Sequence, residues 1–313
     1  MADIRVISGG GYTASINIER GANCISLRHP ATDSVILREP EDADVLDNPY
    51  LYGMPVLFPV NRISGGEFEF EGRVYSFPIN EPDTNCHLHG ELHCTPFEVL
   101  SHSADEIVCR YRADSASPYL IFPHEFEMLI GYRLGDEGLL HTVSITNLSD
   151  KNMPCMLGFH TTFYNGFCRS DNDCEIYADV EKEYARNMKN YLPNGETPRF
   201  DEISRAISQG CWDPTGAPTS RHYRAGKAGR SVIYNKAKDI SLVYEADKKL
   251  GFRLIYNGNA DEYVCLEPQS CLANAPNSPF DRAKAGFDYL SPMETRVYAS
   301  RIYVSAGDKR QEH

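Results

Sequence analysis

The chain has 313 residues, which is long enough for one large β domain or two smaller domains with buried cores. Its formal net charge of −13 produces a long-range field that would repel nucleic acid and anionic membrane, so neither is expected as a partner. Its 19 tyrosines and 14 phenylalanines, together with 23 glycines and 19 prolines, favour many short strands joined by turns.

The N-terminal residues 1–5 lack the apolar run of a secretory signal, and the chain has no stretch of about 18 apolar residues that would predict a membrane span. The ten cysteines are scattered and include no Cys-x-x-Cys pair. In a chain of this size without a signal, we expect reduced thiols and a cytoplasmic location.

Short strands and a loop are predicted before residue 50. Residues 15–18 and 24–27 alternate polar and apolar side chains, as a half-buried strand does. Residues 39–49 are acidic and flanked by prolines, which indicates a loop. A hairpin follows, because residues 67–71 alternate glutamate with phenylalanine and a Glu-Gly turn leads into the apolar residues of 74–77.

The stretch from residue 54 to residue 90 contains several polar groups of chemical interest. An apolar approach leads to Asn61 and Arg62, and the stretch closes on His87 and His89. A hairpin between the two ends could carry Arg62 and His89 to one mouth of a sheet.

Downstream, strand patterns continue to the C-terminus. Further strands are predicted at residues 97–100, 107–111, 126–132, 140–145, 231–234, 240–244, 252–256, 263–266 and 297–304. Residues 126–132 have apolar side chains on both faces, as in a stack of two sheets. The charged residues 181–190 suit a short helix, and residues 211–224 suit a long loop. No repeat or linker is present, so one antiparallel β domain over residues 1–313 is the simplest architecture.

Two side chains are candidates for acid–base chemistry. Glu267 ends an apolar strand and precedes Pro268, which breaks a strand ladder, so its carboxylate would sit partly dried at a sheet rim with a raised pKa. His160 lies in the apolar run of residues 157–163, where a nearby charge could tune it across neutrality. On these residues alone, an exposed strand-end charge and a satisfied core histidine are the commoner fates.

Several motifs together carry a resemblance to a known family. The pattern N-R-I-x-x-G-x-F-x-x-x-G-x-x-Y of residues 61–75 is followed by His-Leu-His-Gly at 87–90, and together they resemble the aldose 1-epimerase (galactose mutarotase) family. The segments 122–126, 157–160 and 265–269 resemble the family's Y-P-F-x-F strand, its G-x-H segment and its C-terminal glutamate strand, in the same order.

The resemblance covers roughly residues 50–305 and implies a fold and an activity. The fold is the all-β, galactose-mutarotase-like super-sandwich of large antiparallel sheets. The activity is interconversion of the α and β anomers of an aldose, in which a base removes the anomeric proton and an acid protonates the ring oxygen. This chemistry needs no metal or redox cofactor, so a small sugar or sugar phosphate is the expected partner.

The resemblance also implies a role for individual residues. Glu267 is expected to be the base and His160 the acid. His89 and Arg62 are expected to donate hydrogen bonds to the sugar, although a weak surface ion pair is the alternative for Arg62. The remaining predicted substrate-binding residues are Asn61, Gln269 and His87, the last because alternate strand residues share a face with His89.

Residues 86–94 contain side chains of the types that bind metal ions. This segment supplies two cysteines and three histidines at close spacing. Only the His-x-x-x-His unit of His89 and His93 meets a zinc-ligand spacing, and a second pair is missing, so no metal site is predicted.

The chain departs from the family at one substrate-binding position. The family has an aspartate in a D-H-x-F segment, whereas residues 220–224 here lack the acid, and Asp213 is a possible substitute. Arg221 and Arg224 would suit an anionic substrate, which leaves a sugar-phosphate mutarotase as an alternative. A non-catalytic carbohydrate-binding or sensing protein on the same fold is a second alternative. A hydrolase is a third, but it would need two flanking carboxylates, and only Glu267 stands out.

Overall fold

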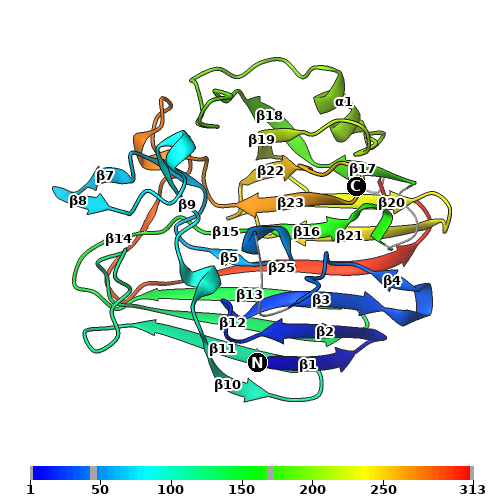
Figure 1. The fold of residues 1–313 in the computed structure, drawn as a ribbon, viewed down its shortest axis with the longest axis horizontal. Helices are drawn as coiled ribbons and strands as arrows, with labels where there is room; N and C mark the ends of the chain where they lie inside the picture. The colour runs from blue at the N-terminus through cyan, green and yellow to red at the C-terminus, as the bar shows by residue number, and fades with distance from the viewer. Residues whose placement is uncertain (1–2, 43–47, 168–172, 311–313) are drawn as a thin grey trace.

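The computed structural model describes residues 3–42, 48–167 and 173–310 of the chain (Figure 1). The described residues form large antiparallel sheets and a single α-helix, which confirms the predicted all-β class. None of the described residues belongs to a helix with the length and apolar character needed to cross a bilayer.

The largest sheet has eight antiparallel strands and runs from the bottom of Figure 1 to its upper right. Its strands, in spatial order, are β10 (Glu98–His102), β11 (Glu106–Ala113), β12 (Phe126–Gly135), β13 (Gly138–Asn147), β25 (Thr295–Ala306), β21 (Ile240–Ala246), β20 (Arg230–Asn235) and β17 (Cys174–Ala178). Side chains of β12 and β13 alternate between buried and partly exposed, as expected for a sheet with one face on the core.

The second large sheet has seven strands and partly overlaps the first in the view of Figure 1. Its path is β18 (Val180–Tyr184), β19 (Ser220–Ala225), β22 (Phe252–Tyr256), β23 (Tyr263–Gln269), β15 (Gly158–Phe159) and β5 (Val56–Leu57), with β16 (Thr161–Tyr164) also paired to β23. All seven residues of β23 are buried, so this strand is covered on both faces.

Aromatic side chains pack the two large sheets against each other. The His141 ring stacks on Tyr132 at 4.8 Å between centroids, and it also meets Phe159 of β15 at 4.5 Å. Tyr244 of β21 meets Phe163 of β16 at 5.4 Å. These contacts orient the short strands β15 and β16, because the residues that face the core leave their neighbours facing the opposite side of the sheet.

Smaller sheets and short helices complete the fold. A four-stranded sheet contains β1 (Ile4–Gly9), β2 (Tyr12–Asn17), β3 (Asn23–His29) and β4 (Ser34–Val35). Two-stranded pairs are β6 (Arg62–Ser64) with β9 (Cys86–Leu88), β7 (Glu67–Phe70) with β8 (Arg73–Ser76), and β14 (Met153–Pro154) with β24 (Tyr289–Leu290). Short 3-10 helices lie at Pro30–Thr32, Pro49–Leu51, Pro82–Thr84, Leu92–Cys94, Asn165–Phe167 and Ala275–Asn277.

The predicted hairpin around residue 71 is confirmed as β7 and β8, with Glu71 and Gly72 both at positive φ in the turn. Part of the predicted loop at residues 39–49 lies outside the described residues. The strands predicted elsewhere are present at β2, β3, β10–β13, β20–β23 and β25.

Two local predictions were wrong. The expected helix at residues 181–190 begins instead as strand β18, because Val180 and Tyr184 are buried and the segment pairs with β19. The expected loop at residues 211–224 ends in that same β19. The α-helix, α1 (Glu202–Gln209), starts where Asp201 accepts a hydrogen bond from the Ser204 amide and ends at Gly210 in the left-handed conformation.

Candidate active site

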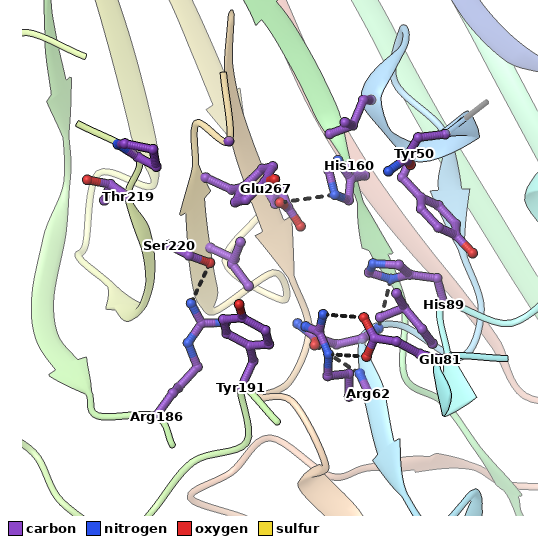
Figure 2. A pocket seen from close by; sticks show the side chains of 18 of the residues that line it. Tyr50, Arg62, Glu81, His89, His160, Arg186, Tyr191, Thr219, Ser220 and Glu267 are labelled. Carbon is purple, nitrogen blue, oxygen red and sulfur yellow. Dashed lines mark hydrogen bonds and ion pairs between the residues drawn. The ribbon is translucent and has the colours of Figure 1, made fainter. Parts of the chain in front are cut away.

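A cavity of about 530 Å³ is lined by residues of the seven-stranded sheet and of the segments around it (Figure 2). A cavity of this size suits a small molecule. Its lining residues are Asn48, Tyr50, Leu51, Asn61, Arg62, Glu81, Leu88, His89, His160, Arg186, Met188, Tyr191, Pro218, Thr219, Ser220, Leu254, Tyr256, Gly258 and Glu267.

Strand register brings Glu267 and His160 together. Gly158 pairs with Gln269 and Thr161 pairs with Leu266, so the same antiparallel register places His160 opposite Glu267. Side chains in directly opposite positions lie about 4.5–5.5 Å apart at their Cβ atoms. The Nε2 atom of His160 is 3.3 Å from Oε1 of Glu267.

The direction of the His160 side chain follows from its two neighbours. Phe159 packs on His141, and the Thr161 hydroxyl is 2.8 Å from the Tyr244 hydroxyl, so both face the eight-stranded sheet. Because successive strand residues point to opposite faces, His160 points into the cavity. The predicted sheet-rim position of Glu267 needs correction, since β23 continues past Pro268 to Gln269 and the carboxyl is only 1% exposed.

Burial shifts the two titrating groups in opposite directions. It raises the pKa of Glu267 to about 8, against smaller lowering effects of a Gln269 hydrogen bond and of Arg186 and Arg62. It lowers the pKa of His160 to about 3. Between about pH 3 and pH 8 the pair is therefore neutral and holds one titratable proton, which is on the carboxyl of Glu267.

An amide relay fixes the other oxygen of the carboxyl. Gln269 donates from Nε2 to Oε2 of Glu267 at 3.0 Å, and Asn61 donates from Nδ2 to Oε1 of Gln269 at 3.0 Å. Oε1 of Glu267 is shielded from solvent and makes no hydrogen bond with the described residues, and it lies 3.3 Å from Nε2 of His160. Gln269 is fully buried and does not line the cavity, so it positions Glu267 instead of facing a substrate.

His89 is held in one tautomer. The backbone N–H of Asn61 donates to Nδ1 of His89 at 3.2 Å, so the ring proton of neutral His89 is on Nε2. Burial, with the neighbouring His160 and Arg62, lowers the pKa of His89 well below its ordinary value. The ring packs against Tyr50 at 4.6 Å between centroids. His89 is thus a neutral hydrogen-bond donor at the cavity wall.

The prediction that His87 shares this wall was wrong. Its ring nitrogen Nδ1 is 2.8 Å from the Pro78 carbonyl, its ring packs on Phe77, and it does not line the cavity. The reason is backbone geometry: β9 ends at Leu88, and His89 has a φ of 66°, so the alternation between the two histidines is lost.

Arg62 lines the cavity but is engaged in an ion pair. Its Nε and Nη2 atoms donate to the two carboxylate oxygens of Glu81 at 2.6 and 2.7 Å. The guanidinium also lies 4.8 Å from the centre of the Tyr191 ring. Both the expected position and the alternative ion pair are therefore present, and direct contact of Arg62 with a substrate stays a prediction.

Several lining residues were not predicted from the sequence. Arg186 lies in the segment 181–190 that was predicted to be a helix, Tyr191 comes directly after that segment, and Tyr50 follows the acidic loop. An isolated bridge between Arg186 and Pro193 closes a turn in which Tyr191 adopts a φ of 57°, and this turn brings both side chains to the cavity. Residues 192–196, Leu-Pro-Asn-Gly-Glu, have the composition of a turn and follow both residues in the chain, so they were the sequence signal for this turn.

The residues considered for the departure from the family lie elsewhere. Asp213 binds the amide and hydroxyl of Thr215 within its own turn. Arg221 is paired with Glu183 at 3.1 Å and with Asp201 at 2.8 Å. None of these groups lines the cavity.

Arg224 is also outside the cavity, where it lies 5.0 Å from the centre of the Phe252 ring. The expectation that Arg221 and Arg224 would face a substrate was therefore wrong.

One group of potential metal ligands occurs among the described residues. Ligand atoms of His160, Cys265 and Glu267 all lie within 4.8 Å of one another. The Cys265 thiol is 3.3 Å from the Thr162 hydroxyl, and burial raises its pKa well above the ordinary value, which favours the protonated thiol. This group differs from the Cys/His segment at residues 86–94 that was weighed from the sequence.

Comparison with known proteins identifies the family and the fold of the chain. The family model described as "Aldose 1-epimerase" matches residues 3–295. A galactose mutarotase-like protein from Clostridium acetobutylicum has a similar structure with a TM-score of 0.89 and 29% identity, covering 96% of this chain and 94% of that chain. The GalM/aldose epimerase homologue from C. elegans has a TM-score of 0.78 over 98% of this chain and 100% of its own, and at 15% identity it supports the fold alone.

A curated relative matches only in part. It is the Escherichia coli K12 protein described as "Uncharacterized protein YphB", which is 27% identical over 109 residues. The match spans 35% of this chain and 36% of that relative, about a third of each.

Proposed function

The chain belongs to the aldose 1-epimerase family, and on that premise we propose that it is a mutarotase that interconverts the α and β anomers of an aldose. The observation that carries the proposal is the buried pair of Glu267 and His160, whose Oε1 and Nε2 atoms are 3.3 Å apart at the cavity wall. A carboxyl and an imidazole with oppositely shifted pKa values are the groups that ring opening requires.

The reaction needs one base and one acid. Glu267 takes the proton from the anomeric hydroxyl while His160 gives a proton to the ring oxygen, and the bond between C1 and the ring oxygen breaks. Rotation about C1–C2 then presents the other face of the aldehyde. The ring closes as the two protons return along the same paths, so the enzyme finishes each turnover in its starting state.

The working state is the ionised form of the same pair. It carries one proton, as the neutral pair does, but on His160 instead of Glu267. Hydrogen bonds from sugar hydroxyls to Oε1 of Glu267, which makes none with the described residues, would stabilise the carboxylate and oppose the effect of burial. We therefore propose that sugar binding transfers the proton to His160 and prepares the pair for catalysis.

The other cavity residues would bind and orient the ring. His89 would donate from Nε2 to a hydroxyl or the ring oxygen, and the Arg62 and Glu81 pair would offer donors and acceptors at one end. Asn61 would act mainly through the relay that fixes Glu267. The apolar faces of Tyr50 and Tyr191 are available to pack on the sugar.

A cytoplasmic location forms part of the proposal. It is supported by the nine cysteines of the described residues, all of which are free thiols. The alternative of a sugar-phosphate mutarotase loses its original support, because Arg221 and Arg224 are not among the residues that line the cavity.

Anomer exchange is the direct test. We would follow freshly dissolved aldoses by polarimetry or exchange NMR with the wild-type protein, with Glu267→Gln and with the matched control Glu262→Gln. Glu262 precedes the same strand and pairs with Arg38 outside the cavity. We expect Glu267→Gln to lower the enzymatic rate about 10²–10⁴-fold, the usual contribution of an acid–base group, and Glu262→Gln to leave it unchanged.

Two results would contradict the proposal. If the rate of Glu267→Gln were within a few-fold of the wild-type rate, Glu267 would not be the catalytic base. Binding of sugars without any acceleration of anomer exchange by the wild type would instead identify a carbohydrate-binding protein on the same fold.

A further inference from the structure

The cavity contains a guanidinium that no described carboxylate neutralises. Arg186 donates from Nη2 to the Ser220 hydroxyl at 2.6 Å (Figure 2). Its Nη1 atom is shielded from solvent and has no hydrogen-bond partner among the described residues. The other cavity arginine, Arg62, has the edge formed by Nε and Nη2 on the two carboxylate oxygens of Glu81.

A guanidinium without a carboxylate partner in this position raises the free energy of the folded protein. Burial lowers the pKa of Arg186 to about 10, and repulsion from Arg62 acts in the same direction. The side chain is still protonated at neutral pH, so the positive charge persists and lacks the partner that buried charges normally have.

Charge counting over the described lining residues gives one uncompensated positive charge. The Arg62 and Glu81 charges cancel, and burial keeps Glu267 protonated at neutral pH, which leaves Arg186. This single positive charge lies inside a molecule whose formal net charge is −13. A cavity with that charge favours a ligand that brings one negative charge.

The surroundings of Arg186 also supply a second donor. Ser220 accepts from Arg186 through its oxygen, so its own hydroxyl hydrogen is free to donate to a ligand at the same point. Figure 2 shows Arg186 and Ser220 on the opposite side of the cavity from Tyr50 and His89. A sugar ring that reaches Glu267 with its anomeric carbon could therefore hold a substituent against Arg186.

We propose that Arg186, with Ser220, binds a carboxylate on the substrate, so that the aldose is a hexuronic acid. This inference rests on the proposed mutarotase function and specifies its substrate class. A guanidinium edge matches the planar geometry of a carboxylate, and one charge of each sign balances. A phosphate dianion would exceed the single positive charge that the described lining residues provide.

Binding and anomer exchange together test the proposal. We would measure affinities by calorimetry for glucuronate, galacturonate, the matching neutral hexoses and their 6-phosphates. The proteins are the wild type, Arg186→Met, Arg186→Lys and the control Arg224→Met, which removes the same charge outside the cavity. Arg186→Lys keeps the charge but loses the two-pronged donor geometry, and it guards against a folding defect in Arg186→Met.

We expect the wild type to bind a hexuronate at least tenfold more tightly than the matching hexose. Arg186→Met should weaken hexuronate binding about ten- to a hundredfold, the effect of losing a charged hydrogen bond, and leave hexose binding within twofold. The hexuronate affinity of Arg186→Lys should lie between those of the wild type and Arg186→Met, and the affinity of Arg224→Met should match that of the wild type. Anomer exchange rates at low substrate concentration should follow the same order.

Three outcomes would overturn this substrate class. Equal losses of affinity for hexose and hexuronate in Arg186→Met would mean that Arg186 serves only to lower the pKa of Glu267. Tighter binding of a hexose 6-phosphate than of any hexuronate would identify a dianionic substrate. Absence of hexuronate binding by the wild type would show that Arg186 and Ser220 do not form an anion site. Arg186-dependent hexuronate binding without anomer exchange would leave the anion site standing and overturn only the mutarotase function.

Discussion

At the scale of single residues, the chemistry depends on how far Glu267 is removed from water. The side chain is 1% exposed, and its pKa rises to about 8 mainly because burial penalises the charged form. The sequence predicted the direction of this shift from the apolar strand before Glu267. It did not predict the amide relay through Gln269 and Asn61, because that relay joins residues 208 positions apart.

The shared proton gives a prediction for the pH dependence of the reaction. Between about pH 3 and pH 8 the pair of Glu267 and His160 holds one proton, and above that range it loses the proton that the acid must supply. We expect kcat/KM, after subtraction of buffer catalysis, to be level up to about pH 8 and to fall with a slope of one at higher pH. A rate that keeps rising through pH 9 would contradict this assignment.

Gln269 should affect that profile although it does not line the cavity. Its hydrogen bond favours the charged carboxylate, so Gln269→Leu removes a lowering effect and should raise the pKa of Glu267 further. We expect the alkaline limb to move up by about one pH unit and kcat to fall about tenfold. A lower rate with an unmoved limb would show that Gln269 has only a structural role.

Linkage predicts an effect of Glu267 on stability. Its folded pKa of about 8 lies above the ordinary 4.5, so the carboxyl is most favourable to folding below pH 4.5 and loses that contribution as pH rises toward 8. Glu267→Gln should therefore gain stability relative to the wild type across this window, by up to about 1.4 kcal/mol per pH unit. Urea unfolding at pH 5 and pH 8 checks this, and parallel changes in both proteins would contradict it.

At the scale of elements, the site depends on the alignment of two short strands with β23. The register from Gly158 to Thr161 sets His160 opposite Glu267. The sequence predicted both residues as functional partners only through the resemblance, since alternation within one strand does not identify the strand that pairs with it. The turn that begins at Arg186 was missed because the charged residues 181–190 were interpreted as a helix.

Gly158 offers a test of this alignment. A Cβ at this position would lie 2.7 Å from Cγ2 of Val60 and 3.0 Å from Cγ of Gln269, so Gly158→Ala must displace one of them. We expect a loss of about 1–3 kcal/mol in the free energy of unfolding and a further fall in kcat as Gln269 moves from Glu267. Gly135→Ala is the matched control, because no atom lies within 4 Å of its added Cβ.

If Gly158→Ala kept the wild-type kcat and pH profile, β15 would not be the element that positions the carboxyl relay. Urea unfolding and anomer exchange on the same preparations separate the stability effect from the catalytic one.

At the scale of the whole molecule, strand β25 joins the two halves of the eight-stranded sheet. It pairs with β13 on one side and with β21 on the other, although these strands are about 100 residues apart in the chain. The two sheets then enclose one core and leave the cavity on the outer face of the seven-stranded sheet. That residues 1–313 form one domain stays a proposal.

Removal of β25 should therefore abolish cooperative folding. A chain that ends at Met293 would expose the edges of β13 and β21 and lose the buried side chains of Tyr298 and Ile302. We expect this chain to aggregate or to unfold without a single urea transition, whereas a chain that ends at Ala306 should retain one. A cooperative transition in the shorter chain would mean that the two halves of the sheet fold independently.

The sequence by itself determined the β class, most strand positions and, through local motifs, the two groups that we assign to acid–base chemistry. These follow from side-chain alternation and turn residues, which act over a few positions and are visible in one segment. The tertiary structure decided which side chains meet. It directs His87 away from the cavity that His89 lines, and it brings Arg186 into that cavity. It also pairs Arg221 with Glu183 and Asp201 outside the cavity, so Arg221 is not a substrate-binding residue there. Such contacts depend on strand register and loop path across the whole chain, and no local pattern encodes them.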